Sequence, residues 1–143
     1  MQKFEIKKLR WDRICQNEFM TMTDKPFDIC ERTFQFSVRV VNLCCFLNKK
    51  QSTVKALSNQ LIRSGTSIGA NVEESRAAQS TADFIHKLEI ALKEARETRY
   101  WIRLLIATNL IPETRLLPLL NEINELMNIL ASMIIKAKEN RKK

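Results

Sequence analysis

The chain has 143 residues, of which 45% are hydrophobic and 28% charged, and its formal net charge is +8 at pH 7. A chain of this length folds as one domain with a substantial core, and its apolar runs are too short to span a membrane. Two glycines, three prolines and one tyrosine are too few for a sheet-rich fold, so the composition predicts an all-α protein.

Residues 1–23 carry mixed charge and one tryptophan, and their apolar residues show only weak periodicity. The segment lacks the apolar core of a signal peptide. Three interpretations stay open: a tail, a short extra helix, or an upstream extension if translation begins at Met20 or Met22. We treat residues 1–23 as an N-terminal extension and residues 24–143 as the helical domain.

The first helix of the domain is predicted over residues 26–48, because Pro26 suits a first helical turn. One apolar seam follows helical spacing through Phe27, Cys30, Phe34, Val38, Val41 and Cys45. A second seam comprises Phe36, Val40, Leu43 and Leu47. This apolar surface is wider than one pair of neighbours would cover. Either the helix is central, or the second seam is exposed and forms an oligomer interface.

The second helix is predicted over residues 53–77, with Ser52 or Thr53 as its N-cap. Its apolar seam comprises Leu57, Leu61, Gly65, Ile68, Val72 and Ser75. Gly65 and Gly69 each cost about 1 kcal/mol relative to alanine in a helix. We interpret both as sites of close helix packing, because a phosphate-binding glycine loop needs a preceding strand and a Lys-Ser/Thr ending that are missing here.

The third helix is predicted over residues 81–109, with Ser80 and Asp83 as its capping signal. Its core seam repeats at steps of four and three through Phe84, Leu88, Ala91, Ala95, Thr98, Ile102 and Leu105. This repeat is typical of a helix bundle. A second row on the same helix places the carboxylates of Glu94 and Glu97 among apolar side chains.

The fourth helix is predicted over residues 113–140. Its buried stripe comprises Leu116, Leu119, Ile123, Leu126, Leu130, Met133 and Ala137. Pro118 falls inside this pattern and is expected to kink the helix start or to separate a short turn from it. The chain ends in a basic sequence, residues 136–143, which the helix dipole favours without any ligand.

Polar side chains beside the apolar seams predict a hydrogen-bonded layer between the second and third helices. We expect Arg63 to be largely buried and to bond Glu94 or Glu97. Ser67 and Asn71 are expected to complete the hydrogen bonds of this polar layer. Separating the partners of a buried ion pair is costly, and removing one of them costs about 3–5 kcal/mol. Such a layer therefore favours the one alignment of the two helices in which the partners meet.

Four cations and an aromatic side chain fall on the outward side of the third helix, and we call them the basic stripe: Lys93, Arg96, Arg99, Tyr100 and Arg103. In a nucleic-acid-binding protein, phosphates would contact these cations and a base would stack on the ring. The alternative is an ordinary solvated helix face. No predicted helix carries more than two excess cations. For a single chain this favours the interpretation as a solvated helix face.

The sequence offers little support for catalysis or for a cofactor. His86 is the single histidine, and no serine, cysteine or aspartate is arranged around it as a catalytic triad requires. A di-iron bundle needs two Glu-x-x-His pairs, and Glu89 follows His86 in the reverse order. We therefore predict a non-enzymatic protein without a bound metal or other cofactor.

Four cysteines occur without a C-x-x-C pair: Cys15, Cys30, Cys44 and Cys45. Neither a disulfide framework nor a zinc site is indicated. Free thiols that pack as small hydrophobic groups suit a reducing compartment, and we expect the protein in the cytoplasm.

Residues 60–105 resemble a known family, the four-helix-bundle proteins related to those encoded in intervening sequences of bacterial 23S ribosomal RNA genes. The positions that carry the resemblance are Gln60, Leu61, Arg63, Ser67, Ile68, Asn71, Glu73 and Phe84. The similarity extends over about residues 27–137. It departs from the pattern at Glu74 and Ser75, because many members have Glu-Gly after the asparagine. The resemblance implies a four-helix bundle, often a ring-like homo-pentamer, with no known enzymatic activity and a suspected role with nucleic acid.

These observations predict an antiparallel up-down four-helix bundle that associates with copies of itself and does not enter membranes. Two functional hypotheses remain. The first is an accessory factor that binds RNA or DNA through the basic stripe. The second is an oligomeric scaffold whose partner is another protein.

Overall fold

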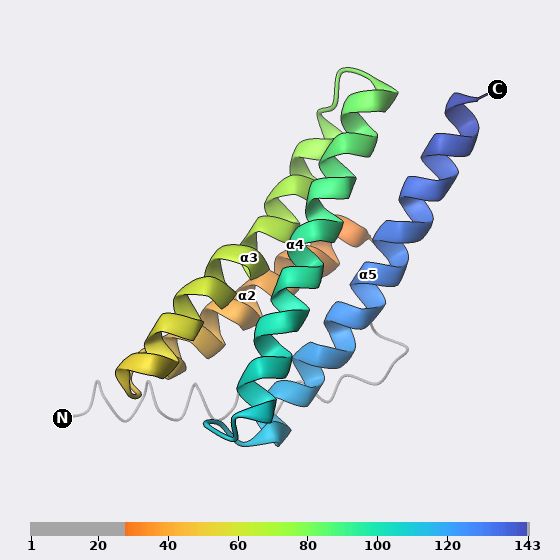
Figure 1. Ribbon diagram of the computed structural model, residues 1–143. Coiled ribbons are helices and arrows are strands. Elements are labelled where there is room, and N and C mark those ends of the chain that lie inside the picture. Colours follow the sequence, from red (N-terminus) through yellow and green to blue (C-terminus); the bar gives the residue numbers. More distant parts are fainter. Residues whose placement is uncertain (1–27, 143) are drawn as a thin grey trace.

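The computed structural model describes residues 28–142, which form four α-helices joined by short loops (Figure 1). The helices are α2 (Ile29–Leu47), α3 (Ser52–Arg76), α4 (Thr81–Ala107) and α5 (Glu113–Arg141). The predicted all-α, antiparallel up-down bundle is confirmed. The predicted extension, residues 1–23, lies outside the described residues.

Each helix packs against its neighbours in the chain, and α5 returns to pack against α2. The diagonal pairs, α2 with α4 and α3 with α5, have no Cα atoms within 8 Å of each other. Figure 1 shows α2 starting near the middle of α5, and the α2–α5 contact is the least extensive of the four. Beyond that point α5 continues beside α4 alone among the described helices.

The start of α2 is set by Asp28. Its backbone is extended (φ −74°, ψ 119°), and its carboxylate accepts a hydrogen bond of 3.0 Å from the backbone N–H of Cys30. Aspartate is a strong N-cap because it satisfies an N–H that has no partner inside the helix. The helix therefore begins at Ile29. Pro26, at which the sequence predicted its start, lies outside the described residues.

The other helix starts differ in how they are capped. Ser80 accepts a 3.1 Å hydrogen bond from the backbone N–H of Asp83, as the sequence predicted for α4. At the start of α3 the N-cap is Gln51, whose side chain makes no capping hydrogen bond, so the predicted serine or threonine cap is wrong. α5 continues through Pro118, so the predicted separation of a short turn is wrong. Pro118 lies in the second turn and has no N–H to donate to the carbonyl four residues earlier.

The end of α4 comes two residues earlier than predicted. Asn109 has a φ of 52°, in the left-handed region that asparagine adopts more readily than most residues. This conformation breaks the helix after Ala107 and turns the chain toward α5. The Thr108 hydroxyl accompanies the turn by donating to the carbonyl of Leu104 at 2.9 Å.

α2 and α3 pack closely against each other, and both glycines lie in this contact. A Cβ atom built on Gly65 would lie 2.8 Å from Cγ1 of Val40, and one on Gly69 would lie 3.2 Å from the backbone oxygen of Thr33. The missing side chains thus let α2 settle against α3, as the sequence predicted.

This packing decides which side of α2 is the core, and it corrects the predicted interface. Phe36, Val40 and Leu47 are completely buried within the chain, and Leu43 is partly buried against the same core. They are therefore not exposed oligomer candidates. The exposed face of α2 is formed by the seam that includes Phe34, Val38, Val41 and Cys45.

The core is a continuous apolar layer between the four helices. Its largest completely buried side chains are Phe36, Leu47, Leu61, Ile68, Leu88, Ile102, Leu105, Leu116, Ile123, Leu126, Leu130 and Val40. Two polar side chains join α3 to α4 inside this layer, where the Thr98 hydroxyl lies 3.0 Å from that of Ser64. Within residues 28–142, no helix is long and apolar enough to cross a membrane.

Candidate functional site

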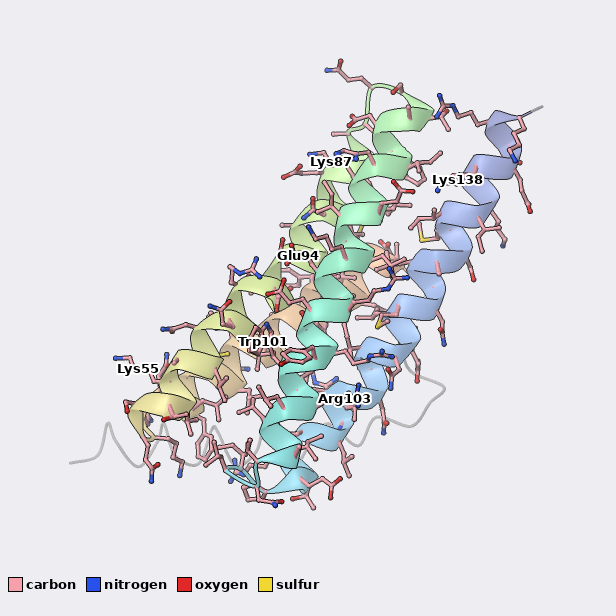
Figure 2. The ribbon with its side chains drawn as sticks, in the orientation of Figure 1. Lys55, Lys87, Glu94, Trp101, Arg103 and Lys138 are labelled. Atoms are coloured by element: carbon pink, nitrogen blue, oxygen red, sulfur yellow. The ribbon has the colours of Figure 1, made fainter. Side chains whose placement is uncertain are left out.

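The basic stripe lies on the outer surface of α4. Lys93, Arg96 and Arg103 are exposed, Arg99 is half-buried, and Tyr100 is 55% exposed. Steps of three and four residues keep these side chains on one side of the helix. Figure 2 shows Arg103 on the side of α4 that faces α5.

The carboxylates of α4 at positions 89, 94 and 97 form ion pairs with cations of neighbouring helices. Figure 2 shows Glu94 on the side facing α3, and both Glu94 and Glu97 accept hydrogen bonds from Arg63 of that helix. Glu89 pairs instead with Lys138 of α5, at 2.6 Å. Among residues 28–142, no carboxylate pairs with a cation of the stripe. Four positive charges therefore remain together at the surface although α4 as a whole is nearly neutral.

Tyr100 is supported from one side by Trp101. The two ring centroids are 4.9 Å apart at an interplanar angle of 74°, a T-shaped contact. The indole N–H of Trp101 donates to Glu97 at 3.2 Å, which holds the tryptophan toward α3. The tyrosine ring is thus fixed by its neighbour while more than half of its surface remains open to solvent.

A groove of about 420 Å³ opens between α4 and α5 beside the stripe, and we call it the α4–α5 groove. Its apolar lining comprises Leu92, Ala131, Ile134 and Ile135. Arg96 of the stripe lines one end, and the Glu89–Lys138 pair lines the other. Ile135 is 57% exposed, so the groove presents an unusually open apolar surface next to a cation.

The predicted polar layer is present in part. Arg63 bonds both Glu94, at 3.4 Å, and Glu97, but its side chain is 52% exposed, so the expected burial is wrong. The long arginine reaches the carboxylates from the surface of the bundle. The Arg63 guanidinium, with the Trp101 indole, holds the pKa of Glu97 below its usual value.

Ser67 and Asn71 do not join this cluster. The Asn71 amide donates to the backbone oxygen of Ser67 at 2.9 Å and to its hydroxyl at 3.3 Å, within the same helix. The polar side chains that do connect α3 and α4 in the interior are those of Ser64 and Thr98, and of these two the sequence analysis assigned only Thr98, to the core seam of the third helix.

A second ion-pair cluster was not predicted. Arg32 of α2 bonds Glu122 of α5 at 2.8 Å and 3.1 Å, and Glu125 at 2.8 Å. The side chains of Arg32 and Glu122 are only 11% and 10% exposed. The sequence feature that could have predicted this cluster is Glu122, a carboxylate on the same side of the helix as the buried Leu119 and Leu126. This cluster links α5 to α2, the smaller of its two helix contacts.

The described residues contain no candidate metal centre. In residues 28–142, no group of three or more histidine, cysteine or acidic side chains is placed to hold a metal ion. His86 is exposed on α4. Cys30 and Cys44 are buried and Cys45 is exposed, all three as free thiols, and burial raises the pKa of the Cys44 thiol.

The chain is similar to known proteins over most of its length. A family model described as 23S rRNA-intervening sequence protein matches residues 25–132. A crystal structure of a protein with unknown function from the S23 ribosomal protein family of Bacteroides thetaiotaomicron is 45% identical, with a TM-score of 0.69. The similarity covers 75% of this chain and 98% of that chain. No curated protein matches the chain.

Proposed function

The chain belongs to the 23S rRNA-intervening sequence protein family, and on this premise we propose that it is a non-enzymatic, cytoplasmic homo-oligomer that binds RNA or DNA as an accessory factor. The observation that carries the proposal is the basic stripe. Its four cations form no ion pair with a carboxylate among the described residues, and Glu89, Glu94 and Glu97 pair with cations of other helices.

Binding through this stripe is chiefly electrostatic. Lysine and arginine that neutralise phosphates release condensed counterions, so affinity falls with salt. Four phosphate contacts per subunit give a slope of about −3 to −4 in a plot of log affinity against log salt. The basic end of α5, from Lys136, adds to the attraction. Recognition is expected to tolerate different sequences, because no recognition helix with base-reading side chains is evident.

Self-association is the second part of the proposal and is supported by the exposed face of α2. Phe34 is 60% exposed, and Val38 and Val41 are each 37% exposed along the same side of the helix. Contiguous apolar surface of this kind marks an interaction site. A ring-like homo-pentamer is the assembly that the family resemblance implies. It would repeat the basic stripe and raise avidity for a long polyanion.

The proposal is tested by fluorescence anisotropy with labelled nucleic acid over a salt series. The double variant Arg96→Glu/Arg103→Glu should abolish binding while circular dichroism shows a folded bundle, since neither side chain is buried. Lys49→Glu/Lys55→Glu is the matched control, because it makes the same charge change at exposed positions near the start of α3. Unchanged affinity in the first variant would refute nucleic-acid binding through the stripe.

Self-association has its own test. Light scattering at micromolar concentration should give a mass that is a multiple of the 16.7 kDa chain. A monomer mass would contradict the oligomer, whereas replacing Val38 with aspartate should dissociate it.

An oligomeric scaffold for a protein partner is the alternative, and the exposed apolar face of α2 also favours it. The two functions differ in their salt dependence, because binding to an apolar partner does not weaken steeply with salt. A ratio of absorbance at 260 nm to that at 280 nm typical of bound nucleic acid in the purified protein would favour the first function.

A further inference from the structure

Two features of this surface are not needed for contact with phosphates alone. One is Tyr100, an exposed ring placed among the cations. The other is the α4–α5 groove, an open apolar hollow that has Arg96 at one end. Both features suit a nucleobase that has left its stack, and they bear on which kind of nucleic acid the site takes.

The spacing of the cations suits the backbone of one strand. Successive cations of the stripe lie three or four residues apart, a rise of about 4.5–6 Å along α4, and the whole stripe spans about 15 Å. Successive phosphates of a stacked strand advance by about 3.4 Å along the duplex axis, and they lie farther apart than this in space because the strand winds around the axis. The cations can therefore follow the phosphates of one strand, and the choice between paired and unpaired bases rests on Tyr100 and the α4–α5 groove.

Tyr100 constrains the state of the bases. It lies one turn after Arg96 and one turn before Arg103, so a strand bound to both cations passes over its ring. The T-shaped contact with Trp101 occupies part of the ring and leaves 55% of the residue exposed. In a duplex the faces of the bases are covered by their neighbours, whereas unpaired bases stack on such rings in single-strand-binding proteins.

The α4–α5 groove offers a place for a second base. Pockets of about 300–1,000 Å³ hold small organic ligands, and this groove, of about 420 Å³, is in that range. Leu92 and Ile135 supply apolar surface for the flat faces of a base. The Glu89–Lys138 pair at the far end offers a hydrogen-bond acceptor and donors for its polar edge. Because Lys138 neutralises Glu89, this carboxylate does not repel an approaching strand strongly.

We infer that the site takes single-stranded nucleic acid, with the backbone along the cations of the stripe, one base stacked on Tyr100 and a neighbouring base in the α4–α5 groove. This inference rests on the proposed function and narrows its ligand to unpaired segments. Ribose and deoxyribose strands share the chemistry that these contacts use.

The test compares three labelled ligands of about 12 nucleotides by anisotropy at fixed salt: a single-stranded RNA, a single-stranded DNA of the same sequence and the DNA duplex. At least one single strand should bind more tightly than the duplex. Tyr100→Ala should weaken single-strand binding by about 5- to 150-fold, as expected for loss of one stacked base, and leave duplex binding unchanged. Tyr100→Phe is the matched control, which keeps the ring and should keep the affinity.

The groove is tested separately by Ile135→Glu, which adds a carboxylate at an exposed position and should weaken single-strand binding. Leu117→Glu, at an exposed leucine of α5 outside the groove, makes the same charge change and should have less effect. The tighter of the two single strands identifies the natural class of ligand.

The failures of the two proposals are distinguishable. Tighter duplex binding, or equal loss from Tyr100→Ala on single strands and duplex, overturns the inference while the stripe remains a nucleic-acid site. Equal effects of Ile135→Glu and Leu117→Glu overturn the role of the groove. If no ligand binds, or if Arg96→Glu/Arg103→Glu leaves binding unchanged, the proposed function fails and the inference falls with it.

Discussion

Replacing Gly65 with alanine tests whether the close approach of α2 and α3 holds the bundle in register. In an exposed helix this substitution stabilises by about 1 kcal/mol through helix propensity alone. Here the new Cβ would lie 2.8 Å from Cγ1 and 3.0 Å from Cγ2 of Val40, a side chain with no exposed surface. Overpacking of a filled core costs about 1–3 kcal/mol. The net effect should be a loss of up to about 2 kcal/mol in the free energy of unfolding.

The sign of the effect should depend on Val40. Val40→Ala removes the two methyl groups that a Cβ on Gly65 would meet, and alone it should destabilise by creating a cavity. In that background Gly65→Ala should become stabilising, since the propensity gain remains and the clash is gone. The double-mutant cycle therefore predicts a coupling of about 1–3 kcal/mol between the two positions.

Urea unfolding followed by circular dichroism measures all four proteins of the cycle. Protein concentration must be equal in each, because self-association would shift apparent stability by mass action. If Gly65→Ala stabilises the protein that retains Val40, or if its effect is the same in both backgrounds, the close-packing argument is refuted.

Three further predictions use other parts of the molecule. Arg32→Ala should destabilise by about 3 kcal/mol in the same unfolding assay, because it leaves the buried Glu122 without this partner, and Arg63→Ala should cost clearly less. Arg63 lowers the pKa of Glu97 in the folded protein, so the ion pair stabilises the fold above pH 4.5, the ordinary pKa, and this stabilisation is lost as the pH falls through the lower folded pKa. Glu97→Gln should therefore destabilise the protein at neutral pH and have less effect in acid, which urea unfolding at several pH values measures. In dilute protein the exposed Cys45 thiol should react quickly with a disulfide reagent, and Cys45→Ser should remove this fast reaction. In the unsubstituted protein the reaction should slow as rising concentration brings the α2 faces together, and a constant rate would contradict association through α2.

The sequence predicted the number and order of the helices because each has a long seam at steps of three and four. It did not predict which side of α2 faces inward, since Phe34 and Phe36 belong to two seams of similar apolarity. The choice depends on α3, where Gly65 leaves space that Val40 fills. Such complementarity joins residues 25 positions apart and leaves no periodic signal in either helix.

The candidate site was predictable as a set of residues but not as an electrostatic feature. Counted along the chain, the carboxylates of α4 cancel most of its positive charge. In the folded protein Arg63 and Lys138 engage those carboxylates from neighbouring helices, which separates the charges in space. The prediction that Arg63 is buried was wrong because its side chain is long enough to reach Glu97 while remaining at the surface.

The position at which α2 begins has a consequence for how the molecule opens. The last turns of α5 run past the start of α2 and have α4 as their single neighbour among the described helices (Figure 1). Segments with one packing partner open locally at a lower free energy than the whole fold. Amide hydrogens in these last turns should therefore exchange with solvent sooner than those of α3 or the first half of α5. Since Ile134, Ile135 and Lys138 belong to the same turns, whatever occupies the groove would also fasten this end of α5 to the bundle.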